Sequence, residues 1–133
     1  MSKMISVASG FQYSVNIGYD LNNDDKLKNF IPTKSALTLL KDILSSTAPD
    51  ATERARVLVG AYGKGKSHII LTILSMLMQR KQSLFTHLMP KIEEDLELSQ
   101  LVDNYYSDDK NKILPVIISG TSSSIPQAFL LAL

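Results

Sequence analysis

The segment from Gly60 to Ser67 reads G-A-Y-G-K-G-K-S and combines three glycines, two lysines and a closing serine. This spacing fits the pattern G-x-x-x-x-G-K-[ST], the P-loop, in which backbone N–H groups of a glycine-rich loop surround phosphate groups. In that pattern Lys66 reaches the β- and γ-phosphates, and the hydroxyl of Ser67 binds Mg²⁺. The motif therefore predicts that the segment binds a nucleoside triphosphate with Mg²⁺.

The glycines have a physical role in this prediction. Gly60, Gly63 and Gly65 are expected to allow backbone angles, and a close approach of phosphate, that a Cβ atom would block. A helix that follows the loop points its positive N-terminal end at the phosphates. The residues expected to contact the nucleotide are Gly60, Ala61, Tyr62, Gly63, Lys64, Gly65, Lys66, Ser67 and His68, with Ser67 as the Mg²⁺ ligand. The alternative is a glycine-rich turn that binds no ligand.

The flanking sequence must place this loop between a strand and a helix. Residues 55–59 (A-R-V-L-V) are short, apolar and β-branched, which is typical of a strand buried on both faces of a parallel sheet. Residues 66–80 carry apolar side chains so densely that they predict a helix packed on more than one side. A second buried strand is expected at 113–119. The predicted fold is therefore α/β, a three-layer P-loop core of parallel strands flanked by helices.

Four further elements follow from the periodicity of apolar residues. Alternation over residues 11–18 (F-Q-Y-S-V-N-I-G) predicts a strand. Helical spacing predicts helices from Lys34 to Leu44, with Thr33 or Ser35 as the cap, from Pro90 to about Tyr105, and from Ser122 onward, with Ser123 or Ser124 as the cap. Together with the loop, these elements suit the start of a nucleotide-binding domain.

The chain of 133 residues has the length of one domain. Residues 1–10 are expected to be flexible, and residues 11–133 to form the N-terminal portion of a P-loop domain with a helical insertion at about 81–112. The sequence ends on Q-A-F-L-L-A-L, an apolar helical pattern without a glycine or a basic last turn. We therefore expect the core to be incomplete at the C-terminus and the chain to belong to a longer protein.

Other residues that could take part in chemistry have more ordinary interpretations. His68 could lie near the phosphates or the ribose, although a polar residue there more often occupies a helix face. Arg54 and Arg56 could act as arginine fingers, although a solvated strand end is favoured. Tyr13 and Tyr19 could stack on adenine, although a core aromatic residue is the more common explanation.

Composition excludes several kinds of site. The chain has no cysteine, which removes disulfides, thiolate catalysis and cysteine-based zinc sites. His87 shows no metal-ligand spacing, and the acidic run at 93–97 is expected to face solvent. The net charge of +1 argues against a stand-alone nucleic-acid module. The longest apolar run, at 69–78, is shorter than the roughly 20 residues of a membrane span, so we expect a cytoplasmic chain without a membrane partner.

Hydrolysis is predicted less strongly than binding. P-loop ATPases hold Mg²⁺ partly through an acidic residue at the end of a second buried strand. The predicted strand at 113–119 contains no Asp or Glu and runs into Gly120. The chain is then part of an ATPase whose carboxylates lie elsewhere, a nucleotide-responsive binding module without turnover, or a truncated fragment. A guanine-reading N-K-x-D motif is absent, which favours ATP over GTP.

Three segments resemble a known family. S-V-N-I-G-Y-D-L (14–21), F-I-P-T (30–33) and V-L-V-G-A-Y-G-K-G-K-S-H (57–68) are similar to the N-terminus of large bacterial P-loop ATPases of phage-defence systems. Examples are the large ATP-binding component of BREX systems and the Y-type ATPase of phage growth limitation. L-P-V-I-I-S-G (114–120) is similar to the next strand–helix unit of that group.

The resemblance implies an AAA+-like ATPase module. Gly60, Gly63, Gly65, Lys66 and Ser67 would then bind ATP and Mg²⁺, and residues 30–33 would pack near the nucleotide pocket. It also implies a larger assembly that contacts DNA or other defence proteins, and a homo-oligomer by analogy with related modules. The later motifs of the family (Walker B, sensors and arginine finger) are not present in the sequence.

Overall fold

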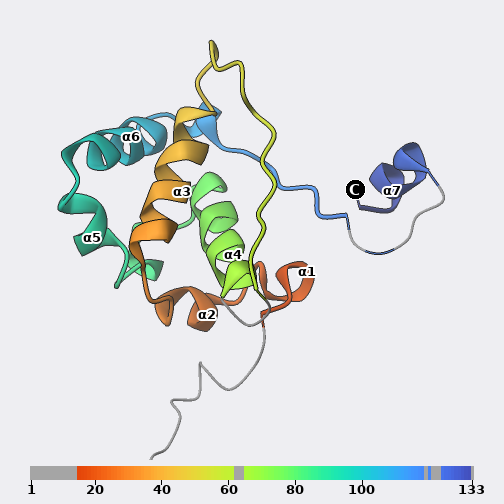
Figure 1. The fold of residues 1–133 in the computed structure, drawn as a ribbon, viewed down its shortest axis with the longest axis horizontal. Coiled ribbons are helices and arrows are strands. Elements are labelled where there is room, and N and C mark those ends of the chain that lie inside the picture. Colours follow the sequence, from red (N-terminus) through yellow and green to blue (C-terminus); the bar gives the residue numbers. More distant parts are fainter. Residues whose placement is uncertain (1–14, 62–64, 119, 121–123, 133) are drawn as a thin grey trace, which may run out of the picture.

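The computed structural model describes residues 15–61, 65–118, 120 and 124–132. All regular structure in these ranges is helical (Figure 1). The elements are α1 Ile17–Asp20, α2 Asp24–Lys28, α3 Lys34–Ser45, α4 Lys66–Leu77, η2 Gln82–Leu84, α5 Met89–Glu93, α6 Leu96–Tyr106, η3 Asp109–Asn111 and α7 Ile125–Ala132. Residues 81–112 are thus largely helical, whereas residues 1–10 lie outside the described ranges. None of the helices in those ranges has the length and apolar character needed to cross a membrane.

The helices pack in a connected series. Helix α3 lies against α6, which lies against α5, while α1 and α2 lie against α4. Figure 1 shows α7 apart from this group, after an extended segment. Helix α2 also lies against η2, so the N-terminal helices meet the rest of the group at both α4 and η2.

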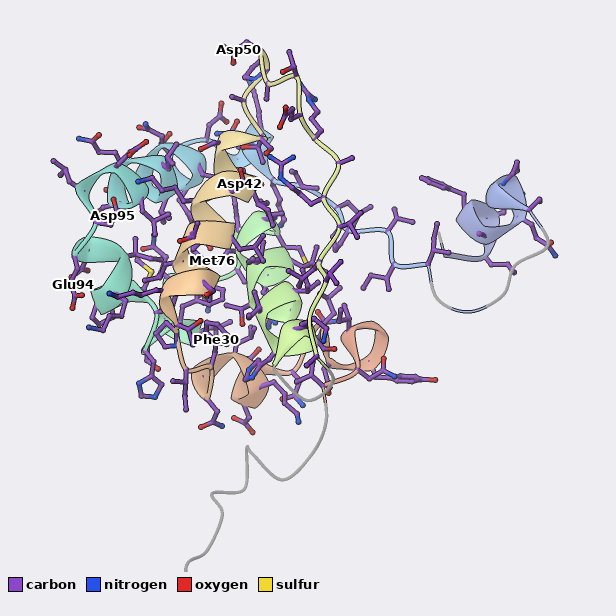
Figure 2. The ribbon with its side chains drawn as sticks, viewed as in Figure 1. Phe30, Asp42, Asp50, Met76, Glu94 and Asp95 are labelled. Atoms are coloured by element: carbon purple, nitrogen blue, oxygen red, sulfur yellow. The ribbon has the colours of Figure 1, made fainter. Side chains whose placement is uncertain are left out.

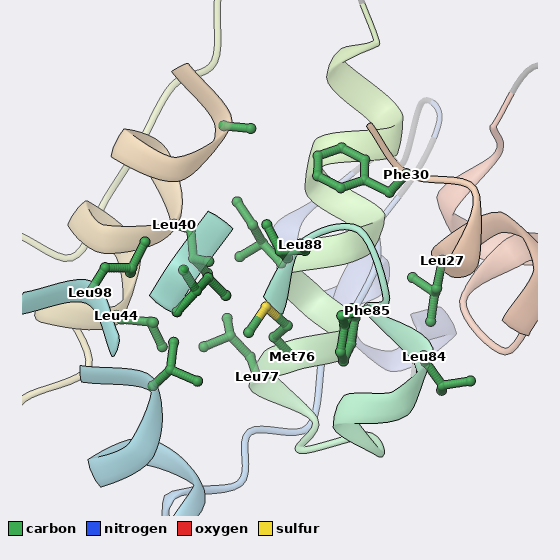
Figure 3. Close-up of a cluster of buried hydrophobic side chains, with 14 of the residues drawn as sticks. Leu27, Phe30, Leu40, Leu44, Met76, Leu77, Leu84, Phe85, Leu88 and Leu98 are labelled. Carbon is green, nitrogen blue, oxygen red and sulfur yellow. The ribbon is translucent and has the colours of Figure 1, made fainter. Parts of the chain in front are cut away.

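A single apolar core fills the space between these helices. Figure 3 shows Leu40 and Leu44 of α3 close to Met76 and Leu77 of α4, with Phe85 nearby. The least exposed core side chains are Leu27, Leu40, Leu71, Met76, Phe85, Ile92, Leu98 and Val102. Burying each such side chain contributes about 1.5–3 kcal/mol before other terms are counted. Helix α4 is buried on several sides, which confirms the prediction from its dense apolar sequence.

The start of α3 confirms the sequence prediction. Thr33 is its cap, because the Thr33 side-chain oxygen accepts a hydrogen bond from the Ala36 N–H at 3.2 Å. Such a bond satisfies one of the N–H groups that a first helical turn leaves unpaired. Ser124 has the same role at α7, where its hydroxyl accepts a hydrogen bond from the Gln127 N–H at 3.3 Å.

The predicted single helix from Pro90 to about Tyr105 is in fact two helices. Helix α5 contains Pro90 in its first turn and ends at Glu93. Asp95 then has an extended backbone, and its carboxylate accepts a hydrogen bond from the Leu98 N–H at 3.1 Å. An aspartate cap inside a continuous apolar pattern starts a new helix, because its side chain competes for the backbone N–H groups.

The predicted three-layer α/β core is wrong, because the described ranges contain no strand. Residues 55–59 and 113–118 are extended, but within those ranges no backbone hydrogen bond joins one segment to the other. Val57 and Val59 are each 88% exposed rather than buried. β-Branched residues favour an extended backbone, but a strand also needs a second strand that pairs with it. The pattern predicted the local conformation and not the sheet.

The strand predicted over residues 11–18 is also wrong where the structure describes it. Ile17 and Gly18 belong to α1, and the Asn16 side chain accepts a hydrogen bond from the Gly18 N–H at 3.1 Å. Residues 11–14 lie outside the described ranges. A local asparagine cap therefore outweighs the alternation of apolar residues here.

Candidate nucleotide-binding site

Helix α4 begins without a side-chain cap. Its N-cap is Gly65, whose φ of 76° lies in the left-handed region that glycine adopts most easily. A Cβ atom at Gly65 would meet nothing within 4 Å, so the backbone angle rather than lack of space favours glycine. Since Gly65 offers no side-chain acceptor, the N–H groups of the first turn are left to solvent or to an anion.

The Lys66 ammonium lies at the entry of the loop. Its Nζ atom donates to the carbonyl oxygens of Gly60 at 2.7 Å and Ala61 at 2.5 Å. An ammonium group has three donors, so one remains for a ligand. A Cβ atom at Gly60 would lie 3.4 Å from the Lys66 Cδ, which is an ordinary contact. The described surroundings of Gly60 therefore leave room for a Cβ atom, and they give no support to the close approach expected at this glycine.

The remaining predicted site residues are placed only in part. Tyr62, Gly63 and Lys64 lie outside the described ranges. Ser67 is exposed in the first turn of α4, and its hydroxyl has no hydrogen-bond partner among the described residues. A hydroxyl oxygen suits Mg²⁺, which prefers oxygen ligands and usually keeps several waters. Ser67 therefore fits the predicted role of metal ligand.

His68 is turned toward α2. Its Nε2 atom lies 2.6 Å from the Lys26 carbonyl oxygen. The imidazole also meets the Phe30 ring edge-on, with ring centres 5.1 Å apart and planes at 75°. Phe30 lies beside α4 in Figures 2 and 3. The side chain thus occupies a packed helix face, which is the more ordinary of the two interpretations given to His68 from the sequence.

The contact with Lys26 is the part of this region that sequence reasoning missed. The carbonyl oxygen that meets His68 belongs to the backbone, and every residue carries such a group. The sequence did point to Phe30, because the resemblance implied that residues 30–33 pack near the nucleotide pocket. Its ring, which is only 5% exposed, lies next to a residue of the first turn of α4.

The two arginines before the loop bind other parts of the chain. Arg56 donates two hydrogen bonds to the Asp42 carboxylate, at 2.6 and 3.2 Å, and the guanidinium lowers the pKa of Asp42. Figure 2 shows Asp42 on α3. The Arg54 guanidinium donates to the carbonyl oxygens of Ala48 at 3.3 Å and Pro49 at 3.0 Å. Both side chains hold the segment that leads to the loop.

The other candidates are dispersed. Tyr19 is 88% exposed on α1, so the core interpretation is wrong for it, and Tyr13 lies outside the described ranges. His87 is exposed. In the acidic run, Asp95 and Glu97 pair with Lys41 at 3.3 and 2.6 Å. Both carboxylates thus meet the Lys41 ammonium, which links α3 to the start of α6, and the described residues contain no group of acidic or histidine side chains that could hold a metal ion.

The arrangement brings an ammonium group, uncapped N–H groups and a serine hydroxyl to one end of α4. Groups of these kinds can donate hydrogen bonds to a polyphosphate and can ligate a metal ion. No family model, curated protein or solved structure matches the chain. The motif and this geometry are therefore the features from which a function can be inferred.

Proposed function

We propose that residues 60–68 bind the polyphosphate of Mg-ATP. The observation that carries the proposal is the position of the Lys66 ammonium, 2.7 Å from the Gly60 oxygen and 2.5 Å from the Ala61 oxygen. Two carbonyls thus hold a positive charge close to the uncapped start of a helix whose N-terminal end is itself positive. A ligand with several negative charges in a small volume matches both features.

The role of Mg²⁺ follows from the same arrangement. The metal ion would be held by the Ser67 hydroxyl together with phosphate oxygens and water, because Mg²⁺ is usually bound through few protein groups. It would neutralise phosphate charge that a single lysine leaves unpaired. The preference for ATP over GTP comes from the sequence, which lacks a guanine-reading motif.

Two functions are compatible with such a site. The resemblance to the large ATPases of phage-defence systems supports an ATPase that works in a larger assembly, with DNA or defence proteins as partners. The second candidate is a nucleotide-responsive module without turnover. The contact between His68 and α2 favours the second candidate, because it joins the proposed phosphate site to a neighbouring segment.

A titration with a fluorescent ATP analogue and Mg²⁺ tests the proposal. We expect Lys66→Ala to weaken binding at least about tenfold, since hydrogen bonds from charged groups contribute about 1.5–3 kcal/mol and 1.4 kcal/mol is tenfold. Lys81→Ala is the matched control, because Lys81 is an exposed lysine beyond the opposite end of α4. Failure of the folded wild-type chain to bind would refute the proposal. Phosphate release in the same samples separates the ATPase from the binding module.

A further inference from the structure

The first turn of α4 has to be stabilised by contacts from outside the helix. Helices usually begin with a side chain that accepts hydrogen bonds from the first N–H groups, and replacing such a cap by alanine costs about 1 kcal/mol. Gly65 makes no such bond. This leaves the N–H groups available to phosphate, but it also leaves the turn that carries Lys66 and Ser67 without its usual local stabilisation.

His68 supplies an anchor for this turn. A carbonyl oxygen can only accept a hydrogen bond, so the 2.6 Å contact with Lys26 requires that Nε2 of His68 carries the proton and donates it. In a continued helix the Phe30 N–H would reach the Lys26 oxygen, but it donates to the Leu27 oxygen at 3.2 Å instead. The imidazole thus meets the backbone of α2 at the point where that helix ends.

Packing adds to this hydrogen bond. The edge-on contact with Phe30 has ring centres 5.1 Å apart, and both Phe30 and Leu27 are buried in the core, with exposures of 5% and 1%. The imidazole therefore packs against a buried residue of the core. Thr72, one turn further along α4, donates from its hydroxyl to the His68 carbonyl oxygen at 2.9 Å. Side chain and backbone of His68 are both fixed.

We infer that His68 is a positioning residue, which holds the first turn of α4 in its phosphate-binding conformation by anchoring it to α2. The inference rests on the proposed function of residues 60–68. If the turn is formed only part of the time, the apparent dissociation constant rises by the inverse of that fraction. Linkage also requires the reverse effect, so that nucleotide bound at the turn strengthens the contact with α2.

Two variants separate positioning from general packing. His68→Leu keeps an apolar side chain but removes the donor, whereas His68→Gln keeps an N–H donor at a similar reach. We expect His68→Leu to bind Mg-ATP about threefold to fivefold more weakly. The variant loses about one hydrogen bond, and part of that loss lowers the stability of the fold while the rest lowers the affinity. We expect His68→Gln to stay within about twofold of the wild type.

Thermal unfolding of the same variants identifies a purely structural role. If His68 only stabilises the fold, His68→Leu would lower the unfolding temperature, and its folded form would bind Mg-ATP with wild-type affinity. That result would overturn the inference, and so would equal weakening in both variants. The proposed function fails separately, by absence of Mg-ATP binding to the wild type or by unchanged binding in Lys66→Ala.

Hydrogen exchange on the wild type gives a test that does not need a folded variant. Addition of saturating Mg-ATP should slow exchange at the amides of residues 27–30, as well as at the first turn of α4. In His68→Leu, where it folds, only the first turn should respond. Protection of the first turn of the wild type without any change at 27–30 would overturn the inference while leaving the nucleotide site intact.

Discussion

The Lys66 ammonium and the Gly60 carbonyl oxygen lie 2.7 Å apart, although the two residues are six positions apart in the chain. The lysine is therefore in place before any ligand arrives. A lysine side chain loses up to about 2 kcal/mol of rotamer freedom when it is fixed. Since part of this cost is met on folding, less of it opposes binding, which is the general advantage of a preorganised site.

Replacing Gly65 by alanine should weaken both the fold and nucleotide binding. The φ of 76° would cost an L-residue about 1–2 kcal/mol, whereas the added Cβ atom itself meets nothing within 4 Å. Gly65→Asn should be milder, because asparagine visits the left-handed region more readily. Urea unfolding measures the stability of both variants, and a titration with Mg-ATP measures their affinity. Equal stability of Gly65→Ala and the wild type would show that the helix does not begin in this conformation.

Ser67→Ala should remove much of the benefit of Mg²⁺ and leave the fold intact. Ser67 is exposed, so its hydroxyl contributes little to packing. We expect the affinity for ATP with Mg²⁺ to fall about tenfold or more, because losing even a group that only orients a metal ligand typically costs about tenfold. The affinity measured with a chelator should stay unchanged. Ser83→Ala is a control at another exposed serine, and a Mg²⁺ effect that persists in Ser67→Ala would contradict the assignment.

Asp95 should make the fold sensitive to acid. The Leu98 N–H and then the Lys41 ammonium lower the pKa of its carboxyl. Because the pKa of Asp95 is lowered in the folded state, its stabilising effect is complete above the pKa of about 3.9 that the carboxyl has in the unfolded chain. The effect is lost as the pH falls through the pKa of the folded state. We expect the urea midpoint of the wild type to decrease as the pH drops below about 4. The midpoint of Asp95→Asn should decrease less steeply over the same pH range. Identical profiles would rule out this contribution.

Two neighbouring polar side chains in α4 should respond in opposite directions. Ser75 is 0% exposed, and its hydroxyl has no hydrogen-bond partner within the described ranges, whereas the Thr72 hydroxyl donates to the His68 oxygen at 2.9 Å. Ser75→Ala should raise the free energy of unfolding by about 0.5–1 kcal/mol, and Thr72→Val should lower it by about 1 kcal/mol. Chemical denaturation measures both. A loss of stability in Ser75→Ala would indicate a partner for the hydroxyl.

Local signals predicted the starts of α3 and α4. Thr33 and Gly65 act within one helical turn, so their neighbours in sequence are also their neighbours in space. The spacing of the glycines and the lysine in the loop can likewise be recognised from the sequence without a fold. Asp95 acts just as locally, but its position inside an apolar pattern concealed the break between α5 and α6.

A sheet would depend on distant parts of the chain, and the contact of His68 does so as well. Residues 55–59 have the composition of a buried strand, but burial needs pairing partners that composition does not specify. His68 and Lys26 are 42 positions apart, and the atom that joins them to each other is a backbone oxygen. Neither relationship leaves a pattern in a single sequence.

The position of the phosphates is the central claim, and backbone amide NMR spectra recorded during a titration with Mg-ATP test it most directly. The account predicts that the largest shifts occur at the amides of Lys66, Ser67 and His68, and that inorganic triphosphate with Mg²⁺ moves the same signals. Lys66→Ala should abolish these shifts at equal ligand concentration. The absence of shifts in the folded wild type, or largest shifts away from the start of α4, would contradict the account.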